Sequence, residues 1–426
     1  MPRWLTLDSP ARTALWWAAT RLVVIGLWIG PENLVRGDVD YYFNRIHMLF
    51  TGTPPTGVLM EYPVPVVWLL TVPYGLGLAN QTGFLIAFMT LFVALDGLIL
   101  LLVWRTARRR GSDPTPAAWT WIAFVLAMGP ITYLRLDLLT AACSVLAVLA
   151  LGRARAGALT GVGAAIKLWP AVLWPATMTD RRQVVRSTIA FAATGGVLAV
   201  ASLLWTGWGR LVSPLTWQSD RGLQIESLWA TPAMLAHLGD AATYRIDMSK
   251  YQAFEIFGPL TQPLLRASSY GTIVGGLVIV GLYVLWLRRP NRTLAEAGLL
   301  MVAATAIMIV TNKTFSPQYL IWLAGPLAAT LALTPSGPSP ARRLLGRAAA
   351  GTLVLTLATQ LVYPLLYDYL IGYKDGPLVW VAQTLLAARN IGLAGLTVWL
   401  IATLVHMLMR RGNAGRDDGS GEGANE

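Results

Sequence analysis

Apolar stretches of about 18 to 20 residues recur along the whole chain, and they constrain its fold more than any other feature. Each is long enough to cross a bilayer as an α-helix, and a soluble protein could not expose this much apolar surface. Of the 426 residues, 55% are hydrophobic and only 13% are charged. The sequence therefore predicts an all-α polytopic membrane protein with about 10 to 12 transmembrane helices.

Short clusters of arginine separate these stretches and predict the topology. By the positive-inside rule, the cytoplasmic clusters are 3–12, 105–110, 153–155, 181–186, 288–292, 342–347 and 410–416. The spans that fit are 13–30, 83–104, 116–131, 138–151, 187–205, 268–287, 294–311, 319–333, 348–366 and 391–409. The net charge of +12 is explained by these turns, which lack the aromatic spacing of a nucleic-acid groove. We expect residues 1–409 to form one transmembrane domain of the plasma membrane with both termini cytoplasmic, and the tail 410–426 to be disordered.

Two apolar segments do not read as simple spans. Segment 63–79 is broken by prolines and glycines, which favours a helix lying at the outer interface. Segment 156–178 is interrupted at Lys167 and Pro170 and is expected to form a pair of short helices. The outer face then holds three polar segments, 31–82, 206–261 and 367–378, so we expect the chemistry on the extracytoplasmic side.

The first outer segment carries two acids, Asp38 and Asp40, just after the first span. In soluble sugar transferases such an Asp-x-Asp pair would suggest a divalent metal that holds a nucleotide diphosphate. Nucleotide sugars are cytoplasmic and this pair is expected to face outward, so an activated sugar reaching it must be carried on a membrane lipid. The lipid phosphate leaves with its charge already in place, and one carboxylate suffices to take the acceptor's proton. If Asp38 caps a helix running through Leu49, then Tyr42 and Arg45 share its stripe while Asp40 points elsewhere. The residues themselves leave open which acid is the base, or whether Asp38 only caps the helix.

Further polar side chains of the outer segments are candidates for binding. Glu61 could hold a sugar hydroxyl or pair with Arg36 or Arg45. The residues expected to bind substrate are Tyr42, Arg45, Glu61, Tyr62, Arg221, Gln224, Glu226 and Gln318. The cations expected to include a ligand of the lipid phosphate are Lys167, Arg221, Lys313 and Arg389.

Three other features lead to expectations about charge and metal. Arg135 and Asp137 share a short turn and are expected to pair with each other. Asp96 lies inside a span, where a local hydrogen-bonding role is favoured over a proton relay. The three histidines have no metal-ligand spacing, so neither a metal nor a cofactor is expected.

Four short motifs occur in this order along the chain: GDVDYY at 37–42, EYP at 61–63, AAIKLWP at 164–170 and FSPQY at 315–319. Together they resemble the glycosyltransferase family 87 proteins of actinobacteria. The resemblance implies a GT-C fold and a polyprenol-phosphate-mannose-dependent mannosyltransferase of cell-envelope glycolipid assembly. It also implies Asp38 as the catalytic base, with Asp40 as second choice, and Tyr42 matches the tyrosine that follows four residues on.

The leading hypothesis is an inverting, metal-independent transfer of mannose from a polyprenyl phosphate to a lipid-anchored mannoside, such as a phosphatidylinositol mannoside or lipomannan. A polyprenyl-phosphate-arabinose-dependent arabinofuranosyltransferase would use the same architecture. A lipid or solute transporter is the alternative from another class, motivated by Asp96 and the broken segment at Lys167.

Overall fold

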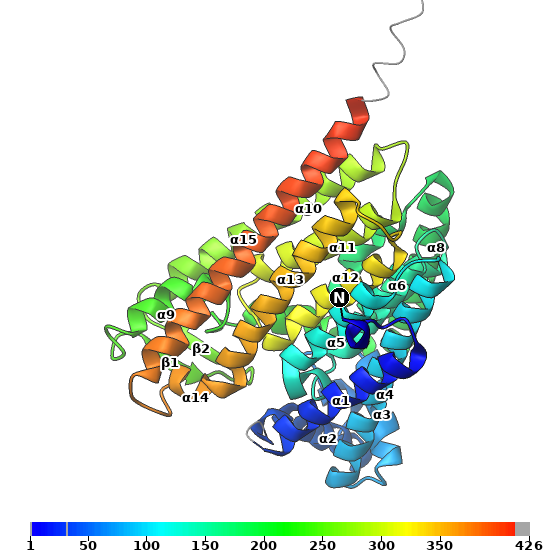
Figure 1. The fold of residues 1–426 in the computed structure, drawn as a ribbon. Helices are drawn as coiled ribbons and strands as arrows, with labels where there is room; N and C mark the ends of the chain where they lie inside the picture. The colour runs from blue at the N-terminus through cyan, green and yellow to red at the C-terminus, as the bar shows by residue number, and fades with distance from the viewer. Residues whose placement is uncertain (1, 31–32, 414–426) are drawn as a thin grey trace, which may run out of the picture.

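The computed structural model describes residues 2–30 and 33–413, and its regular structure is almost entirely helical (Figure 1). The helices are α1 (Pro10–Ile29), α2 (Gly37–Phe50), α3 (Pro65–Leu76), α4 (Gln81–Arg109), α5 (Thr115–Met128), α6 (Asp137–Leu149), α7 (Arg155–Ile166), α8 (Arg181–Asp220), α9 (Thr231–His237), α10 (Thr261–Leu287), α11 (Leu294–Thr311), α12 (Ile321–Leu333), α13 (Pro340–Gln360), α14 (Tyr367–Leu370) and α15 (Leu378–Asn413). Shorter helical turns are η1 (Arg3–Leu5), η2 (Asn33–Arg36), η3 (Pro55–Gly57), η4 (Gly129–Tyr133), η5 (Trp169–Thr177), η6 (Leu228–Ala230), η7 (Pro317–Leu320) and η8 (Leu361–Leu365). Strands β1 (Arg245–Met248) and β2 (Phe254–Phe257) form an antiparallel hairpin with Arg245 opposite Phe257.

Six of the described helices are long and apolar enough to cross a membrane. They are α4, α8, α10, α11, the continuous segment Pro340–Leu365, and α15 over Leu378–Met409. The other four expected spans correspond to α1, α5, α6 and α12, which are helical but lie outside this set. The prediction of a polytopic all-α membrane protein is therefore confirmed.

The arrangement of buried and exposed apolar residues fits a bilayer. Every residue of α12 is buried, and α12 packs against α5, α6, α11 and α13 at the centre of the molecule. Peripheral helices instead expose large apolar side chains, such as Val197 and Leu204 on α8 and Ile273 and Leu277 on α10. Such a surface is stable only against lipid tails, because water would penalise each exposed apolar side chain.

Both irregular segments are broken as expected. α3 contains Pro73 and has 12 residues, which at 1.5 Å per residue is too short to cross the hydrocarbon core. Lys167 has an extended backbone (φ −153°, ψ 128°) and separates α7 from η5, which carries Pro170 and Pro175. The predicted pair of short helices in 156–178 is confirmed.

The outer segment 206–261 differs in part from the expectation. Gly207 has φ 77° and interrupts α8, but the chain then resumes a helical path to Asp220. Glycine adopts this positive φ without a steric penalty, so the helix changes direction there instead of ending. The segment therefore starts as a helix and only later forms the turn that leads to α9 and the hairpin.

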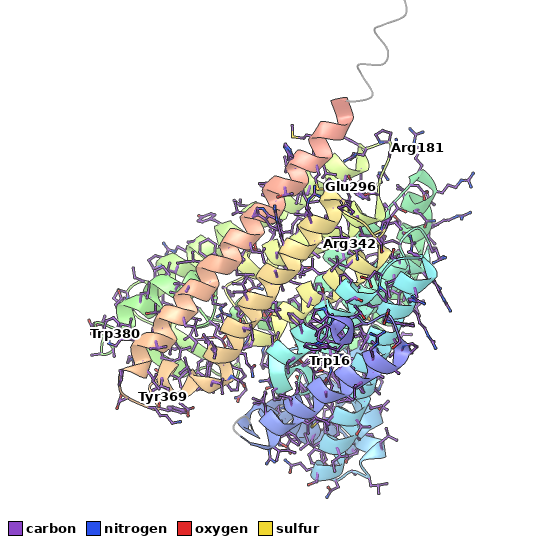
Figure 2. The ribbon with its side chains drawn as sticks, viewed as in Figure 1. Trp16, Arg181, Glu296, Arg342, Tyr369 and Trp380 are labelled. Atoms are coloured by element: carbon purple, nitrogen blue, oxygen red, sulfur yellow. The ribbon has the colours of Figure 1, made fainter. Side chains whose placement is uncertain are left out.

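Two pairs of labelled residues lie toward opposite ends of the molecule. Figure 2 shows Arg181 and Glu296 toward one end, and Tyr369 and Trp380 toward the other. The first group lies at the starts of α8 and α11, and the second lies in α14 and at the start of α15. α15 continues to Asn413, beyond the predicted start of the tail at 410, and residues 414–426 lie outside the described part of the chain.

Candidate active site

Asp38 forms a close ion pair with Arg135. Asp38 is in the first turn of α2, while Arg135 comes from the turn between η4 and α6. The residue before α2 is Arg36 and no side chain caps the helix, so the alternative in which Asp38 only caps the helix is wrong. The helix start still favours a carboxylate, because its free N–H groups carry partial positive charge. The Asp38 side chain is 42% exposed and that of Arg135 is 13% exposed, so the pair has an open acid and a largely buried cation.

Asp40 faces other partners. Its carboxylate lies 3.2 Å from Nε of Arg36 and accepts a hydrogen bond of 2.9 Å from Nε2 of Gln81. The prediction that the two acids of α2 point in different directions is confirmed, because Asp38 and Asp40 have no partner in common.

Asp137 pairs with Lys167 and not with Arg135, so the prediction of an Arg135–Asp137 pair is wrong. Nζ of Lys167 lies 2.8 Å from Oδ1 of Asp137, which also accepts a hydrogen bond of 2.9 Å from the indole of Trp322. Asp137 begins α6 and its side chain points into the protein, whereas Arg135 precedes the helix and reaches α2. Although Arg135 and Asp137 are two residues apart, Arg135 pairs with a residue of α2 and Asp137 pairs with Lys167 at the end of α7.

Lys167 also lies over aromatic rings. Its ammonium group is 5.0 Å from the ring centroids of both Tyr319 and Trp322. Trp169 stacks on Trp322, with 4.6 Å between the two ring centroids. A lone lysine at membrane depth needs a counter-charge, and Asp137 and the faces of the two rings interact with its charge.

The expected tyrosines and Glu61 line the space beside this ion pair. The hydroxyls of Tyr42 and Tyr62 are 3.0 Å apart, and both rings are largely buried. Burial raises the pKa of Tyr62, and the nearby charges of Glu61 and Asp137 raise it further. The same charge of Asp137 acts on Tyr42, so the tyrosine pair lies next to the Asp137–Lys167 pair.

Glu61 does not form the alternative ion pair with Arg36. It accepts a hydrogen bond of 2.9 Å from the hydroxyl of Tyr41, and Arg45 lies 5.0 Å from the centre of the Tyr41 ring. Burial raises the pKa of Glu61, opposed by its hydrogen bonds and by the charge of Arg45. Tyr41 therefore contacts both Glu61 and Arg45, the other arginine that the sequence suggested as a partner of Glu61.

A second polar cluster is formed by Glu226 and Arg389. Nη2 of Arg389 donates to the carbonyl oxygen of Glu226 at 3.1 Å and lies 3.6 Å from its carboxylate. The guanidinium also lies 4.0 Å from the ring centre of Phe315, whose N–H donates to Gln224. Burial raises the pKa of Glu226 to about 7, against the opposing charges of Arg389 and Arg135. Arg135 thus lies between Asp38 and this cluster.

The remaining expected binding residues lie around the turn 312–318. Nζ of Lys313 donates to the carbonyl oxygen of Ser219 at 2.7 Å. Burial lowers the pKa of Lys313, and the charge of Arg221 acts in the same direction, so these two cations are neighbours. Gln318 is half-buried in η7. The four candidate phosphate ligands are therefore spread over three places, with Lys167 on Asp137, Arg389 on Glu226, and Arg221 beside Lys313.

The sequence analysis paired Arg135 with the wrong acid and did not identify Arg21 as the partner of Asp96. Arg135 is the partner of Asp38, and its Nη2 lies 3.5 Å from the hydroxyl of Tyr363. Arg21 is buried in α1 and pairs with Asp96. A signal for the second pair existed, because a lone arginine and a lone acid inside two spans need each other. No sequence signal distinguished Asp38 from Asp137 as the partner of Arg135.

Within residues 2–30 and 33–413, no three His, Cys, Asp or Glu side chains are grouped as the ligands of a metal would be. The polar groups at hand are one open carboxylate, several cations and a set of tyrosine hydroxyls. These can take a proton, stabilise an anion and bind hydroxyl groups of a sugar.

Comparison with known proteins identifies the family. The model of glycosyltransferase family 87 matches residues 61–311, which is more than half of the chain. The match includes Glu61, Lys167 and Glu226, whereas Asp38 and Arg389 lie outside it. No curated protein matches this chain. The chain therefore belongs to glycosyltransferase family 87, and it is a polytopic membrane glycosyltransferase with the GT-C fold.

Proposed function

We propose that the protein transfers mannose from a polyprenyl-phosphate mannose to a lipid-anchored mannoside, with inversion at the anomeric carbon. The observation that carries the proposal is the open carboxylate of Asp38 at the edge of a cluster of cations and tyrosines. Family membership supplies the reaction class, glycosyl transfer in a membrane.

Asp38 is the proposed base because the other acids of the region are already occupied. Asp137 is buried and bound by Lys167 and Trp322. Asp40 is held by Arg36 and Gln81. Asp38 is paired with Arg135, but its side chain is 42% exposed and leaves room for an acceptor hydroxyl. A base has to come within hydrogen-bond reach of the proton that it removes, and only an open carboxylate allows this.

The proposed step is a single displacement. A carboxylate oxygen of Asp38 takes the proton of the acceptor hydroxyl. At the same time, the oxygen of that hydroxyl forms a bond to C1 of mannose. The bond from C1 to the phosphate oxygen breaks, and polyprenyl phosphate leaves with the electron pair. A β-linked donor then gives an α-linked product. The leaving phosphate is a stable anion that nearby cations can stabilise, so the proposed step needs no metal ion.

Lys167 is the cation of this region that is proposed to receive the phosphate. Lys167 is 23% exposed and is backed by aromatic rings, so it can turn toward an incoming anion while retaining Asp137 on its other side. The tyrosine pair and Glu61 offer hydrogen bonds to sugar hydroxyls. Arg221 and Lys313 are proposed to meet the donor or acceptor headgroup farther out.

The proposed site faces the extracytoplasmic side of the plasma membrane, with both termini in the cytoplasm. The alternation of arginine-rich turns with polar outer segments along the sequence supports this orientation, and Arg181 lies toward the opposite end of the molecule from Tyr369 (Figure 2). A lipid-linked donor follows from it, because only a membrane carrier delivers activated sugar to that side.

A transporter is a weaker candidate. Asp96, the acid inside a span that suggested ion coupling, is fully buried and accepts hydrogen bonds from four side chains. An acid so fully satisfied is suited to holding helices together and not to exchanging protons with a passage.

The test uses membranes that contain the full-length protein or its Asp38→Asn variant. Each preparation receives either polyprenyl-phosphate mannose or polyprenyl-phosphate arabinose, and mass spectrometry identifies the glycolipid products. We expect an α-mannosylated lipid from the unmodified protein only. A product from the arabinose donor alone would overturn the choice of sugar, and full activity of the variant would overturn the choice of base.

A further inference from the structure

An apolar groove of about 410 Å³ lies between α5, α12 and α13, away from the candidate active site. Trp119 and Phe124 line it from α5, Leu327 lines it from α12, and Gly346 and Leu353 line it from α13. Arg342 is the one charged residue of its wall. The groove therefore combines an apolar lining with a single cation.

The groove follows the helices. On α13 its wall runs from Arg342 to Leu353, which at 1.5 Å per residue is a length of about 16 Å. On α5 it runs from Pro116 to Phe124, in the same direction from the start of the helix. Arg342 therefore lies at one end of the groove, and the rest of the groove is apolar. The segment Pro340–Leu365 is one of the candidate membrane spans, so the groove runs along a candidate span from its arginine-rich start.

Small residues on α13 keep the groove open. A Cβ placed on Gly346 would have no atom within 4 Å, and the wall continues with Ala349 and Ala350. Larger side chains on this face of α13 would fill the space. Trp119 and Phe124, which are wide and apolar, line the groove from α5. The shape suits a thin flexible hydrocarbon chain.

The end of the groove at Arg342 is strongly cationic. Nη1 of Arg342 donates to the carbonyl oxygens of Thr334 and Pro335 at 3.3 and 3.2 Å, which holds the side chain at the rim. Arg343 and Arg347 follow in the first turns of α13, and residues 335–366 contain no Asp or Glu. The arginine-rich end of α4 is adjacent, because Oγ of Ser112 bonds to the carbonyl oxygen of Thr334. Asp113 is the acid in this turn, and its backbone N–H bonds to Ser336.

We propose that this groove binds an anionic phospholipid, with one acyl chain between α5 and α13 and the phosphate against Arg342. Basic pockets between transmembrane helices recognise anionic headgroups by charge, and the acyl chain gains contacts in a groove that fits it. The site is independent of the proposed transfer reaction. It lies at the start of α13, whereas the π-helical turn η8 after α13 brings Tyr363 to Arg135.

The test offers the full-length protein equal amounts of phosphatidylglycerol and phosphatidylcholine with matched acyl chains, and native mass spectrometry counts the lipids retained. We expect about a fivefold preference for phosphatidylglycerol, the size expected for one cation at an anionic headgroup. Arg342→Gln should abolish the preference. Gly346→Phe should reduce retention of both lipids, because the ring fills the groove.

Two control variants match these changes. Arg181→Gln removes the same charge at the arginine-rich end, at the start of α8. Val354→Phe adds the same ring on α13 at a side chain that is 64% exposed. Both controls should retain lipid as the unmodified protein does. Equal loss of the preference in Arg181→Gln would overturn the site, and so would an absence of preference in the unmodified protein. The site would also be overturned if the protein were a dimer whose lipid content is unchanged by Gly346→Phe, because a second copy of the chain would then be the occupant of the groove.

Discussion

Arg135 is ion-paired with Asp38 across the junction between α2 and the turn before α6. The same guanidinium lies 3.5 Å from the hydroxyl of Tyr363, and its charge acts on Glu226. An arginine held from several sides fixes the carboxylate that it binds. In the proposed reaction, Arg135 is therefore a positioning residue for Asp38, because it orients the base and favours its ionised form.

Removal of Arg135 should change the pH dependence of transfer. In Arg135→Gln the carboxylate loses the cation that favours its charged form, so the acidic limb of the rate profile should move to higher pH. The rate at the optimum should fall by about tenfold to a hundredfold, since the base is no longer held in place. Initial rates of glycolipid formation between pH 5 and pH 9 measure both effects.

Arg36→Gln is the matched control for Arg135→Gln, because it removes an equal charge from the neighbouring acid Asp40. Its pH profile should coincide with that of the unmodified protein. If Arg135→Gln only raised the KM for the lipid donor, with no shift of the acidic limb, then Arg135 would be a phosphate ligand and not a positioning residue.

The two acids of α2 should respond differently to the same substitution. Asp38→Asn keeps the shape of the side chain but removes the base, and the rate should fall about a hundredfold to ten thousandfold. Asp40→Asn should retain most of the activity, because Asp40 bonds to Arg36 and Gln81 on the other side of the helix. Both variants should accumulate in the membrane to the same level. A larger loss in Asp40→Asn than in Asp38→Asn would reverse the assignment.

The sequence was sufficient for the helical architecture because lipid imposes a simple length and polarity rule on each span. The break at Lys167 was also predictable, since proline and a lone lysine both oppose a continuous buried helix. Pairing was not predictable. Arg135 has Asp137 two residues away, and only the direction in which α6 begins sends Asp137 to Lys167 and Arg135 to Asp38. Choices of this kind depend on how distant helices pack, which local spacing does not encode.

Glu226 should make the stability of the protein depend on pH. Burial raises the pKa of Glu226 to about 7 from an ordinary value near 4.5. Between these values the folded protein holds a proton that the unfolded chain has lost, so this group's contribution to stability is lost as the pH rises through the window. From pH 5 to pH 8 the free energy of unfolding should fall by roughly 2 kcal/mol more in the unmodified protein than in Glu226→Gln. Thermal unfolding of both proteins at the two pH values measures this difference, and two parallel pH curves would contradict it.

The ion pair formed by Arg21 and Asp96 should be required for the stability of the folded protein. Nε and Nη2 of Arg21 donate to the two carboxylate oxygens at 2.7 and 2.8 Å. Trp17, Trp121 and Tyr133 donate to the same carboxylate, also at 2.7 to 2.8 Å. Asp96 therefore joins α1, α4, α5 and η4 next to the turn that carries Arg135.

Asp96→Ala should destabilise the protein strongly, because it leaves the buried guanidinium of Arg21 without its counter-charge. The expected loss is about 3 to 5 kcal/mol, seen as a lower thermal midpoint and a smaller folded fraction in membrane extracts. The double variant Arg21→Met with Asp96→Leu should recover much of this loss, because a buried ion pair can be replaced by apolar side chains at little cost. Transfer activity per folded molecule should then be close to that of the unmodified protein. A double variant that folds but has no activity would give Asp96 a role in the reaction. A double variant that is no more stable than Asp96→Ala would show that the hydrogen bonds from the tryptophans and the tyrosine, and not the ion pair, hold these helices together.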